Sequence, residues 1–274
     1  MTIIPAALDR RVVTGGLDHV EGICWDPVRG CLWAGGEAGQ VYRIDLDGSA
    51  TIVATIAGAA LLGLALDGDG AIYACDPARH QVWRVREDGV VEVFGAPIDY
   101  PNYAAFASDG SLYVSDSGSF LEATGRLWRI EPDGTTSDVT PRPIRYANGL
   151  CVDGDSLWIV ESAAPGVSRM DLATGDIEFV VAMERCQPDG LALDAEGGLI
   201  ISCYQPNQIF RYHEGRLDLI VEDWSGEFIL SPTNVAFYGE NLDRLALASL
   251  CGHDVVSIRP PAPGRPVPIP RRAS

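Results

Sequence analysis

A short cassette of alternating residues recurs down the whole chain at intervals of 40 to 46 residues. Its six copies read QVYRI, QVWRV, RLWRI, GVSRM, QIFRY and DVVSI, and they begin at Gln40, Gln81, Arg126, Gly166, Gln208 and Asp254. Each of the first five is followed by a turn or break and a second apolar run, which is typical of two strands joined by a hairpin. A repeat of this length indicates a supersecondary unit that buries its apolar faces against neighbouring copies.

Another pair of short apolar runs stands upstream of each cassette, for example EGICWD before CLWAGG and DGLALD before LIISCY. Four strands in about 40 residues, without helical periodicity, match the size of one β-propeller blade. The aligned blade starts are Glu21, Leu62, Asn102, Asn148, Asp189 and Thr233. We therefore predict an all-β fold in which residues 1–274 form a single six-bladed β-propeller of four-stranded blades.

The two ends of the chain are predicted to play different parts. The sixth unit has only three clear strands, whereas the chain opens with an unassigned strand-like run, RRVVTGG. We expect this N-terminal strand to complete the sixth blade and close the ring, because closure leaves no long exposed edge. The Pro-rich C-terminal tail, residues 260–274, is predicted to be extended polyproline II that packs on the surface or stays loose in solvent.

The charge balance limits the class of partner. Twenty basic and 38 acidic residues give a net charge of −18, which repels nucleic acid and anionic lipid surfaces. The longest apolar stretch, residues 51–66, is interrupted and falls short of the roughly 20 clean residues of a membrane helix. Seven scattered cysteines without a C-x-x-C pair favour buried thiols in a reducing compartment. With Asp9, Arg10 and Arg11 where a secretion signal would be apolar, we expect a cytoplasmic protein.

Oxygen-bearing side chains stand at four of the six blade starts, at Glu21, Asn102, Asn148 and Asp189. The first strand of a propeller blade lies next to the axis, so these side chains should converge on one face of the disc. Carboxylate and amide oxygens favour hard cations such as Ca²⁺, Mg²⁺ or Mn²⁺, and without a cation the two carboxylates would repel each other. The alternative interpretation is that the Asn-Gly and Asp-Gly pairs are ordinary turn formers.

Five successive blade starts also resemble those of a known family. The runs VEGICWDP, PNYAAFASDGSLYVSD, YANGLCVDGDSLWIVES, QPDGLALDAEGGLIISC and SPTNVAFYG are similar to the senescence marker protein/gluconolactonase/luciferin-regenerating enzyme (regucalcin-like) family, from about residue 17 to residue 258. The resemblance implies one divalent cation bound by Glu21, Asn148 and Asp189. Calcium is the first expectation, with magnesium, manganese or zinc as alternatives. It also implies that Asn102 binds the substrate or lies near the metal.

The activity implied by this resemblance is metal-dependent hydrolysis of a small-molecule lactone or ester. A cation polarises the lactone carbonyl, and Asp189 acts as the general base that accepts a proton from water. Sugar-lactone members commonly carry an arginine where this chain has Tyr100, and often an aspartate where it has Tyr103. With Tyr146 and Tyr204 near other blade starts, these residues predict an aromatic wall and a less polar substrate. The competing interpretation is that the tyrosines only pack at the rim.

Two further features are predicted to lie near the pocket. The third-blade loop SDSGSFLEATG is about five residues longer than its counterparts, so Phe120 and Glu122 are candidate lid residues. A plain surface insertion is the alternative. His253 follows the second strand of the last blade and should face the same pocket. The sequence contains no G-x-S-x-G elbow, which argues against a serine hydrolase.

Three other functions stay open on the sequence alone. A phosphotriesterase is the second enzyme hypothesis, because diisopropyl fluorophosphatase resembles this architecture and uses a similar oxygen cage. A non-catalytic propeller would bind a ligand or a protein partner, but it has no need of four axial oxygen donors. Recruitment of the scaffold to other chemistry, as in strictosidine synthase, is disfavoured by the retention of Glu21, Asn148 and Asp189.

Overall fold

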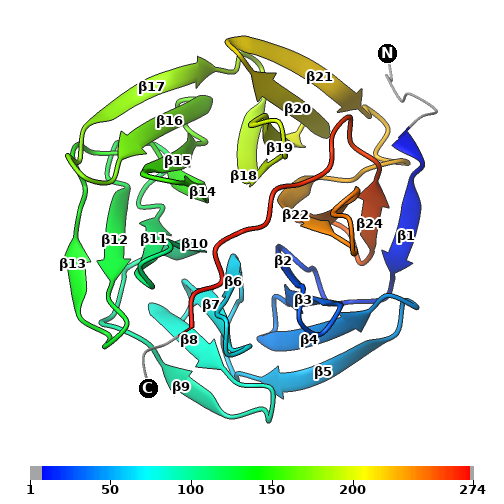
Figure 1. Ribbon diagram of the computed structural model, residues 1–274, viewed down its shortest axis with the longest axis horizontal. Coiled ribbons are helices and arrows are strands. Elements are labelled where there is room, and N and C mark those ends of the chain that lie inside the picture. Colours follow the sequence, from blue (N-terminus) through cyan, green and yellow to red (C-terminus); the bar gives the residue numbers. More distant parts are fainter. Residues whose placement is uncertain (1–7, 272–274) are drawn as a thin grey trace.

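The computed structural model describes residues 8–271 and shows six four-stranded antiparallel sheets arranged around one axis (Figure 1). In each blade the first strand lies nearest the axis and the last forms the outer edge. The predicted all-β, six-bladed propeller is thereby confirmed. No helix within the described residues is long and apolar enough to cross a bilayer.

The strands of the first three blades, from the axis outward, are β2 (Gly22–Asp26), β3 (Cys31–Gly35), β4 (Gln40–Asp45) and β5 (Ala50–Thr55), then β6 (Leu64–Leu66), β7 (Ile72–Asp76), β8 (Gln81–Val85) and β9 (Val91–Val93), then β10 (Pro101–Phe106), β11 (Leu112–Asp116), β12 (Arg126–Ile130) and β13 (Thr136–Asp138). The fourth and fifth blades are β14 (Ala147–Asp153), β15 (Ser156–Glu161), β16 (Gly166–Asp171) and β17 (Ile177–Ala182), then β18 (Gln187–Leu193), β19 (Leu199–Gln205), β20 (Gln208–His213) and β21 (Arg216–Glu222).

The sixth blade joins the two ends of the chain. It consists of β22 (Pro232–Tyr238), β23 (Arg244–Ser249), β24 (Val255–Ile258) and the N-terminal strand β1 (Arg11–Thr14). Strand β1 pairs antiparallel with β24, with Arg11 opposite Ser257. The predicted closure of the ring by the N-terminal strand is confirmed, and it satisfies the backbone hydrogen bonds along one edge of β24.

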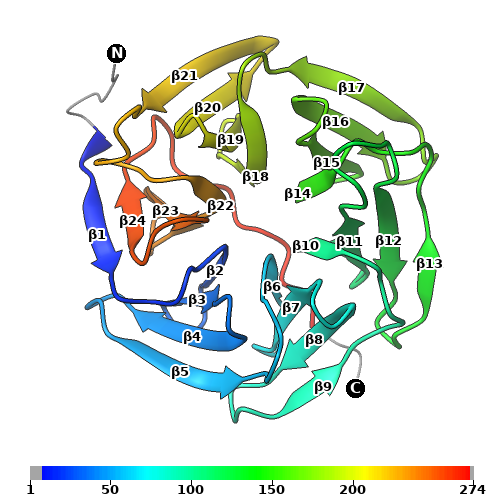
Figure 2. The same ribbon diagram turned by 180° about the vertical axis from the view of Figure 1, so that it is seen from behind.

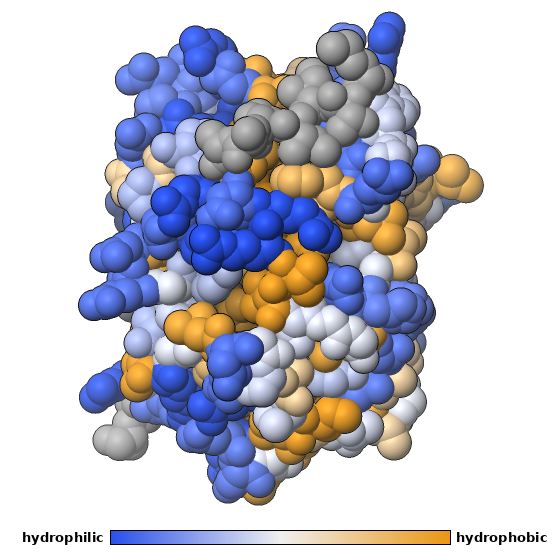
Figure 3. All heavy atoms as spheres, turned by 90° about the vertical axis from the view of Figure 1, so that its right-hand side faces the viewer, coloured by the Kyte–Doolittle hydropathy of each residue, from blue (hydrophilic) through white to orange (hydrophobic). Residues whose placement is uncertain are grey.

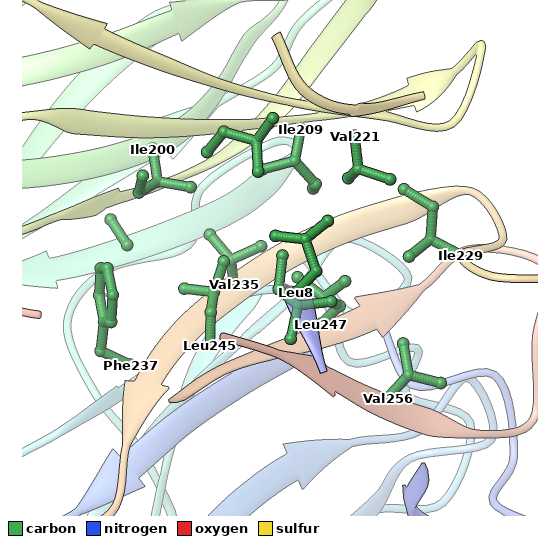
Figure 4. Close-up of a cluster of buried hydrophobic side chains, with 13 residues drawn as sticks. Leu8, Ile200, Ile209, Val221, Ile229, Val235, Phe237, Leu245, Leu247 and Val256 are labelled. Atoms are coloured by element: carbon green, nitrogen blue, oxygen red, sulfur yellow. The ribbon is translucent and has the colours of Figure 1, made fainter. Parts of the chain in front are cut away.

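The hydrophobic core is divided among the interfaces between neighbouring blades. At one interface Ile200 and Ile209 of the fifth blade face Val235 and Leu247 of the sixth, with Leu8 beside them (Figure 4). The inner strands of each blade are therefore covered on both faces by the neighbouring blades. This is why strands such as β3 and β7 are buried along their whole length instead of alternating between apolar and polar residues.

The arginine of the repeated cassette pairs with acidic residues away from the axis. Arg211 Nε lies 2.6 Å from Asp194 Oδ2, and Arg129 Nη2 lies 3.0 Å from Asp109 Oδ2. The edge of the disc on the β1 side carries mostly hydrophilic side chains with apolar groups between them (Figure 3). These arginines are therefore paired within the blades and lie apart from the axial residues.

Neighbouring inner strands touch near the axis with no side chain between them. A Cβ atom added to Gly22 would lie 1.9 Å from the Leu62 carbonyl oxygen, and one added to Gly149 would lie 2.1 Å from the Asp189 carbonyl oxygen. Gly149 and Gly190 lie inside strands β14 and β18. The alternative that these Asn-Gly and Asp-Gly pairs form turns is therefore wrong, because the glycines permit close contact between blades.

The C-terminal tail runs across the axis on one face of the disc, in front of it in Figure 1 and behind it in Figure 2. The Ala195 amide donates a hydrogen bond to the Pro263 carbonyl at 2.8 Å, and the Gly68 amide donates to the Pro270 carbonyl at 2.8 Å. The tail is therefore packed on the surface rather than loose. The last three residues of the predicted tail, 272–274, lie outside the described residues.

Gly149→Ala should destabilise the ring strongly, because its methyl group would meet the Asp189 carbonyl oxygen of the next blade. We expect the free energy of unfolding to fall by about 3 kcal/mol or more, the upper end for overpacking, as measured by urea denaturation. Gly175→Ala is the matched control, since its methyl enters open space at a positive φ of 78° and should cost only about 1 kcal/mol. Equal losses in the two variants would contradict this account.

Candidate metal and catalytic site

Four oxygen-bearing side chains meet at the axis where the inner strands begin, and we call them the axial cage: Glu21, Asn148, Asp189 and Asn234. Asn148 Nδ2 donates to Asp189 Oδ2 at 3.0 Å, and Asn234 Nδ2 lies 3.5 Å from Asp189 Oδ1. The Asn234 backbone amide donates to the Glu21 carbonyl at 3.3 Å. The structure therefore brings together the three predicted metal ligands and adds Asn234.

Burial governs the electrostatics of the two carboxylates in the axial cage. Burial, followed by the negative charges of Asp189 and Glu37, raises the pKa of Glu21 to about 8. Burial also raises the pKa of Asp189 to about 7, against the opposing effect of hydrogen bonds from Asn148 and Asn234. No basic side chain of the described chain contributes to either pKa. The protein's own residues thus leave the negative charge of this pair uncompensated.

Two amide oxygens of the axial cage also lack partners. Asn148 Oδ1 and Asn234 Oδ1 are buried and accept no hydrogen bond. An unsatisfied buried acceptor costs about 1–3 kcal/mol, so two of them at one point call for an electropositive partner. Carboxylate and amide oxygens are the ligands that Ca²⁺ and other hard cations take, and the residues therefore fit a divalent cation of this kind.

The donor set is made of oxygens rather than of the ligands that zinc commonly takes. Among residues 8–271, no three His, Cys, Asp or Glu side chains gather as they would in a metal site built from those residues alone. Only two members of the axial cage are carboxylates, and the rest of the coordination would have to come from Asn oxygens. This composition favours a hard cation over a softer metal bound by nitrogen and sulfur.

Serine hydroxyls near the ends of the second strands hold the axial amides in place. Ser162 Oγ accepts from Asn148 Nδ2 at 3.2 Å and donates to the Pro188 carbonyl of the next blade at 2.7 Å. Ser117 Oγ accepts in the same way from Asn102 Nδ2 at 2.9 Å. Because each amide nitrogen is tied down, the orientation of the amide oxygen is set by the neighbouring blade.

Sequence reasoning missed the serines and Asn234. Asn234 stands one residue after the aligned blade start Thr233, where four other blades carry glycine, so the alignment assigned it no role. The sequence did contain a signal for the serines. Ser117 in the third blade and Ser162 in the fourth each follow the acidic residue that ends the second strand. Reading the strand ends in register would have selected Ser117 and Ser162.

Three aromatic side chains form a cluster beside the axial residues, which we call the aromatic wall: Tyr100, Phe120 and Tyr146. The ring centroids of Tyr100 and Tyr146 are 6.4 Å apart, and those of Phe120 and Tyr146 are 5.1 Å apart. Tyr100 and Phe120 are each 38% exposed, so the wall is open to solvent. Burial, followed by the charges of Asp189 and Glu21, raises the pKa of Tyr204 to about 12, which places its hydroxyl within electrostatic reach of both carboxylates.

The other predicted site residues lie apart from the aromatic wall. Tyr103 is buried beneath the axial cage and packs in a hydrophobic cluster with Leu150. His253 lies at the rim, where its ring centroid is 4.4 Å from that of His19. Glu122 is exposed within the long third-blade loop. Of this loop, Phe120 is the residue that belongs to the aromatic wall, through its contact with Tyr146.

A model of the SMP-30/gluconolactonase/LRE-like region matches residues 91–250, and no curated protein matches the sequence. Among solved structures, the chain resembles the calcium-binding protein regucalcin from Agrobacterium tumefaciens, with a TM-score of 0.81 and 18% identity over 99% of each chain. It also resembles a gluconolactonase from Xanthomonas campestris, with a TM-score of 0.78 and 18% identity over 94% of each chain.

Virginiamycin B lyase from Staphylococcus aureus gives a TM-score of 0.69 at 17% identity, over 92% of this chain and 99% of that one. At such identities the three structures show a shared fold and nothing about chemistry. The family match carries more weight, because it spans more than half of the chain and includes Asn148 and Asp189 of the axial cage. The chain belongs to the SMP-30/gluconolactonase/LRE-like family.

Proposed function

We propose that this protein is a divalent-cation-dependent hydrolase that opens a lactone or cyclic ester. The observation that carries the proposal is the axial cage, in which two carboxylates of raised pKa and two unpartnered amide oxygens meet without a basic side chain. Membership of the family, together with neighbours named gluconolactonase and calcium-binding regucalcin, supports the same activity and favours calcium.

The residues of the axial cage have distinct parts in this proposal. Glu21, Asn148 and Asp189 would hold the cation, and Asn234 stands beside them. A cation held there would supply Lewis-acid polarisation of the substrate carbonyl. Asp189 accepts a proton from the attacking water, and the amide nitrogens of Asn148 and Asn234 fix the orientation of its carboxylate.

The walls of the site determine the class of substrate. Asn102 has its amide nitrogen held by Ser117, so its carbonyl oxygen is the group left to orient the substrate. Tyr100 offers a ring and a single hydroxyl where sugar-lactone relatives commonly have the forked donor of an arginine. A wall of Tyr100, Phe120 and Tyr146 suits apolar or aromatic substituents, and the proposed substrate is a lactone or ester less polar than a sugar lactone.

The setting of the reaction follows from charge and thiol state. The net charge of −18 disfavours nucleic acid and anionic membranes as partners. All seven cysteines are free thiols, which suits a reducing compartment, and a cytoplasmic location is part of this proposal. A phosphotriester is the second substrate class to include in any screen, because the same oxygen cage could polarise a phosphoryl group.

Binding of the cation should be visible in the stability of the protein. We expect Ca²⁺ to raise the melting temperature of EDTA-treated protein, because ligand at 100 times its Kd adds about 2.7 kcal/mol. Glu21→Gln should need more Ca²⁺ for the same shift. Glu37→Gln is the matched control, since this carboxylate is 68% exposed and acts on Glu21 only through its charge. An unchanged melting temperature with Ca²⁺, Mg²⁺ and Mn²⁺ would refute the metal site.

Asp189→Asn should separate proton acceptance from metal binding, because it keeps an oxygen ligand and removes the base. At saturating cation we expect kcat to fall by roughly 10² to 10⁴, the range for loss of a general base. Glu21→Gln should instead be rescued in part by excess cation, since mass action offsets a weakened ligand. Glu178→Gln, on the outermost strand β17, is the control. A turnover near that of the wild type in Asp189→Asn would overturn this role.

The aromatic wall predicts substrate preference. We expect kcat/KM to be higher for aliphatic or aromatic lactones than for aldonolactones, and Tyr100→Arg should move the ratio toward aldonolactones by adding a forked donor for hydroxyl groups. Phe179→Arg serves as control, because Phe179 is 46% exposed on the outermost strand β17. If an aldonolactone is the best wild-type substrate by a wide margin, the substrate class proposed here is wrong while the hydrolase proposal stands.

A further inference from the structure

A second, apolar space lies on the axis beneath the axial cage. It has a volume of about 430 Å³, and all six inner strands contribute to its wall. The wall begins two residues beyond the members of the cage, at Ile23, Leu150 and Leu191, and continues to Phe106 and Phe237 farther along the strands. We call this space the axial cavity. Its volume lies within the range of about 300–1,000 Å³ that is typical of small-molecule sites.

The axial cavity is separate from the proposed hydrolytic site. At the level of the cage the inner strands lie close together, because a Cβ atom added to Gly149 would lie 2.1 Å from the Asp189 carbonyl oxygen, so there is little room between blades. The side chains of the cage then project into the narrow opening that remains. A lactone that approaches Asp189 from the solvent side would meet the cage before it reached the cavity.

The polar side-chain groups on the inner wall are neutral. Apart from the indole N–H of Trp25, they are the hydroxyl of Tyr103 and the thiols of Cys24 and Cys151. Burial raises the pKa of each, that of Cys151 to about 12, so all three stay protonated near neutral pH. Among the described residues, the buried side-chain nitrogens and oxygens without a hydrogen-bond partner all lie outside this wall. Two charged residues, Glu240 and Arg265, also line the cavity. Glu240 is exposed, and the Arg265 guanidinium pairs with Asp153. The wall formed by the inner strands therefore offers no charge for an ionic ligand and few partners for water.

The C-terminal tail forms the floor of the axial cavity, and we call residues 263–270 the C-terminal strap. One end is fixed to the fourth and fifth blades, where the Arg265 amide donates to the Leu193 carbonyl at 2.9 Å and the Arg265 guanidinium pairs with Asp153. The other end is fixed at Pro270 by the Gly68 amide of the second blade. The strap thus spans the ring from one side to the other (Figure 1).

The middle of the strap is held by side-chain packing alone. Residues 266–269 read Pro-Val-Pro-Ile and line the cavity, and the two prolines have no backbone N–H to donate. Val267 is 58% exposed although it lies on the floor, so a single thickness of chain separates the cavity from solvent. Releasing the anchor at Arg265 would open the lower mouth without disturbing a blade.

We propose that the axial cavity is a second binding site that takes one neutral, apolar small molecule, and that this ligand enters where the C-terminal strap lifts. Neutrality follows from the uncharged wall of the inner strands, since Glu240 and Arg265 lie beyond the strands and Arg265 is paired with Asp153. Apolar character follows from the Leu, Ile, Val and Phe side chains of that wall. The backbone contacts of the ring above and the strap below leave space for a small molecule rather than a peptide segment. This site is independent of the proposed hydrolysis.

The test uses N-phenyl-1-naphthylamine, an uncharged probe whose fluorescence rises in apolar surroundings, titrated into the full-length protein. We expect saturable binding of one probe per chain. Ala236→Phe should weaken binding at least tenfold, because Ala236 lines the cavity and is only half-buried, so the added ring fills the space. Ala173→Phe, at an exposed turn, is the matched control. Glu21→Gln should bind the probe as the wild type does.

Two further measurements keep the proposal falsifiable. Arg265→Ala should raise the association rate constant of the probe in stopped-flow experiments, because it removes the pair with Asp153 and leaves only backbone hydrogen bonds to hold that end of the strap. An unchanged rate would overturn the entry route. Should Ala236→Phe fail to fold, Ala105→Leu on the same wall replaces it. Crystals under xenon pressure should show a xenon peak between the axial cage and the strap. Absence of that peak, or equal probe affinity in the filled variant and the wild type, would overturn the site.

Discussion

The close contact of inner strands at the axis is the constraint on which the rest of the structure depends. Glycines after the axial residues let the backbone of one blade touch the next, so that a Cβ atom at Gly22 or Gly149 would overlap a neighbouring carbonyl. This contact sets the diameter of the ring and brings side chains from different blades within hydrogen-bond distance. Asn148 and Asp189 are 41 residues apart in sequence, yet their side chains lie 3.0 Å apart.

The centre of the ring holds polar groups in an electrostatically unfavourable environment. Two carboxylates with raised pKa values and two unpartnered amide oxygens would each be more stable in water than in this position. Packing between the blades holds them there, and the Ser162 hydroxyl fixes the amide of Asn148 as Ser117 fixes that of Asn102. A site whose donors are preorganised in this way binds a cation without a further cost of rearranging the protein.

The fold could be predicted from the sequence because repeat length and strand pattern are local properties, repeated six times. Glu21, Asn148 and Asp189, the proposed metal ligands, were selected by their equivalent positions in successive blades and by the family resemblance. Asn234 could not be found in this way, because it occupies the position that holds glycine in four other blades, and only its side-chain contact with Asp189 shows its place at the axis. Tyr103 was grouped with Tyr100, but Tyr100 precedes strand β10 and a register shift separates Pro101 from Tyr103. Tyr103 is buried, whereas Tyr100 is 38% exposed.

Position along the inner strands explains how one ring holds two chemically different spaces. Glu21 and Ile23 belong to one stretch of chain, as do Asp189 and Leu191, and each pair changes from oxygen ligand to apolar wall within two residues. The axial cage lies between the solvent-facing site and the axial cavity. A substitution in the wall of the axial cavity can therefore alter that cavity while the side chains of the cage keep their positions. The strap, which follows the last blade in sequence, can likewise vary without any change to the strands. The chemistry at one face and the contents of the axis are therefore free to diverge independently within this fold.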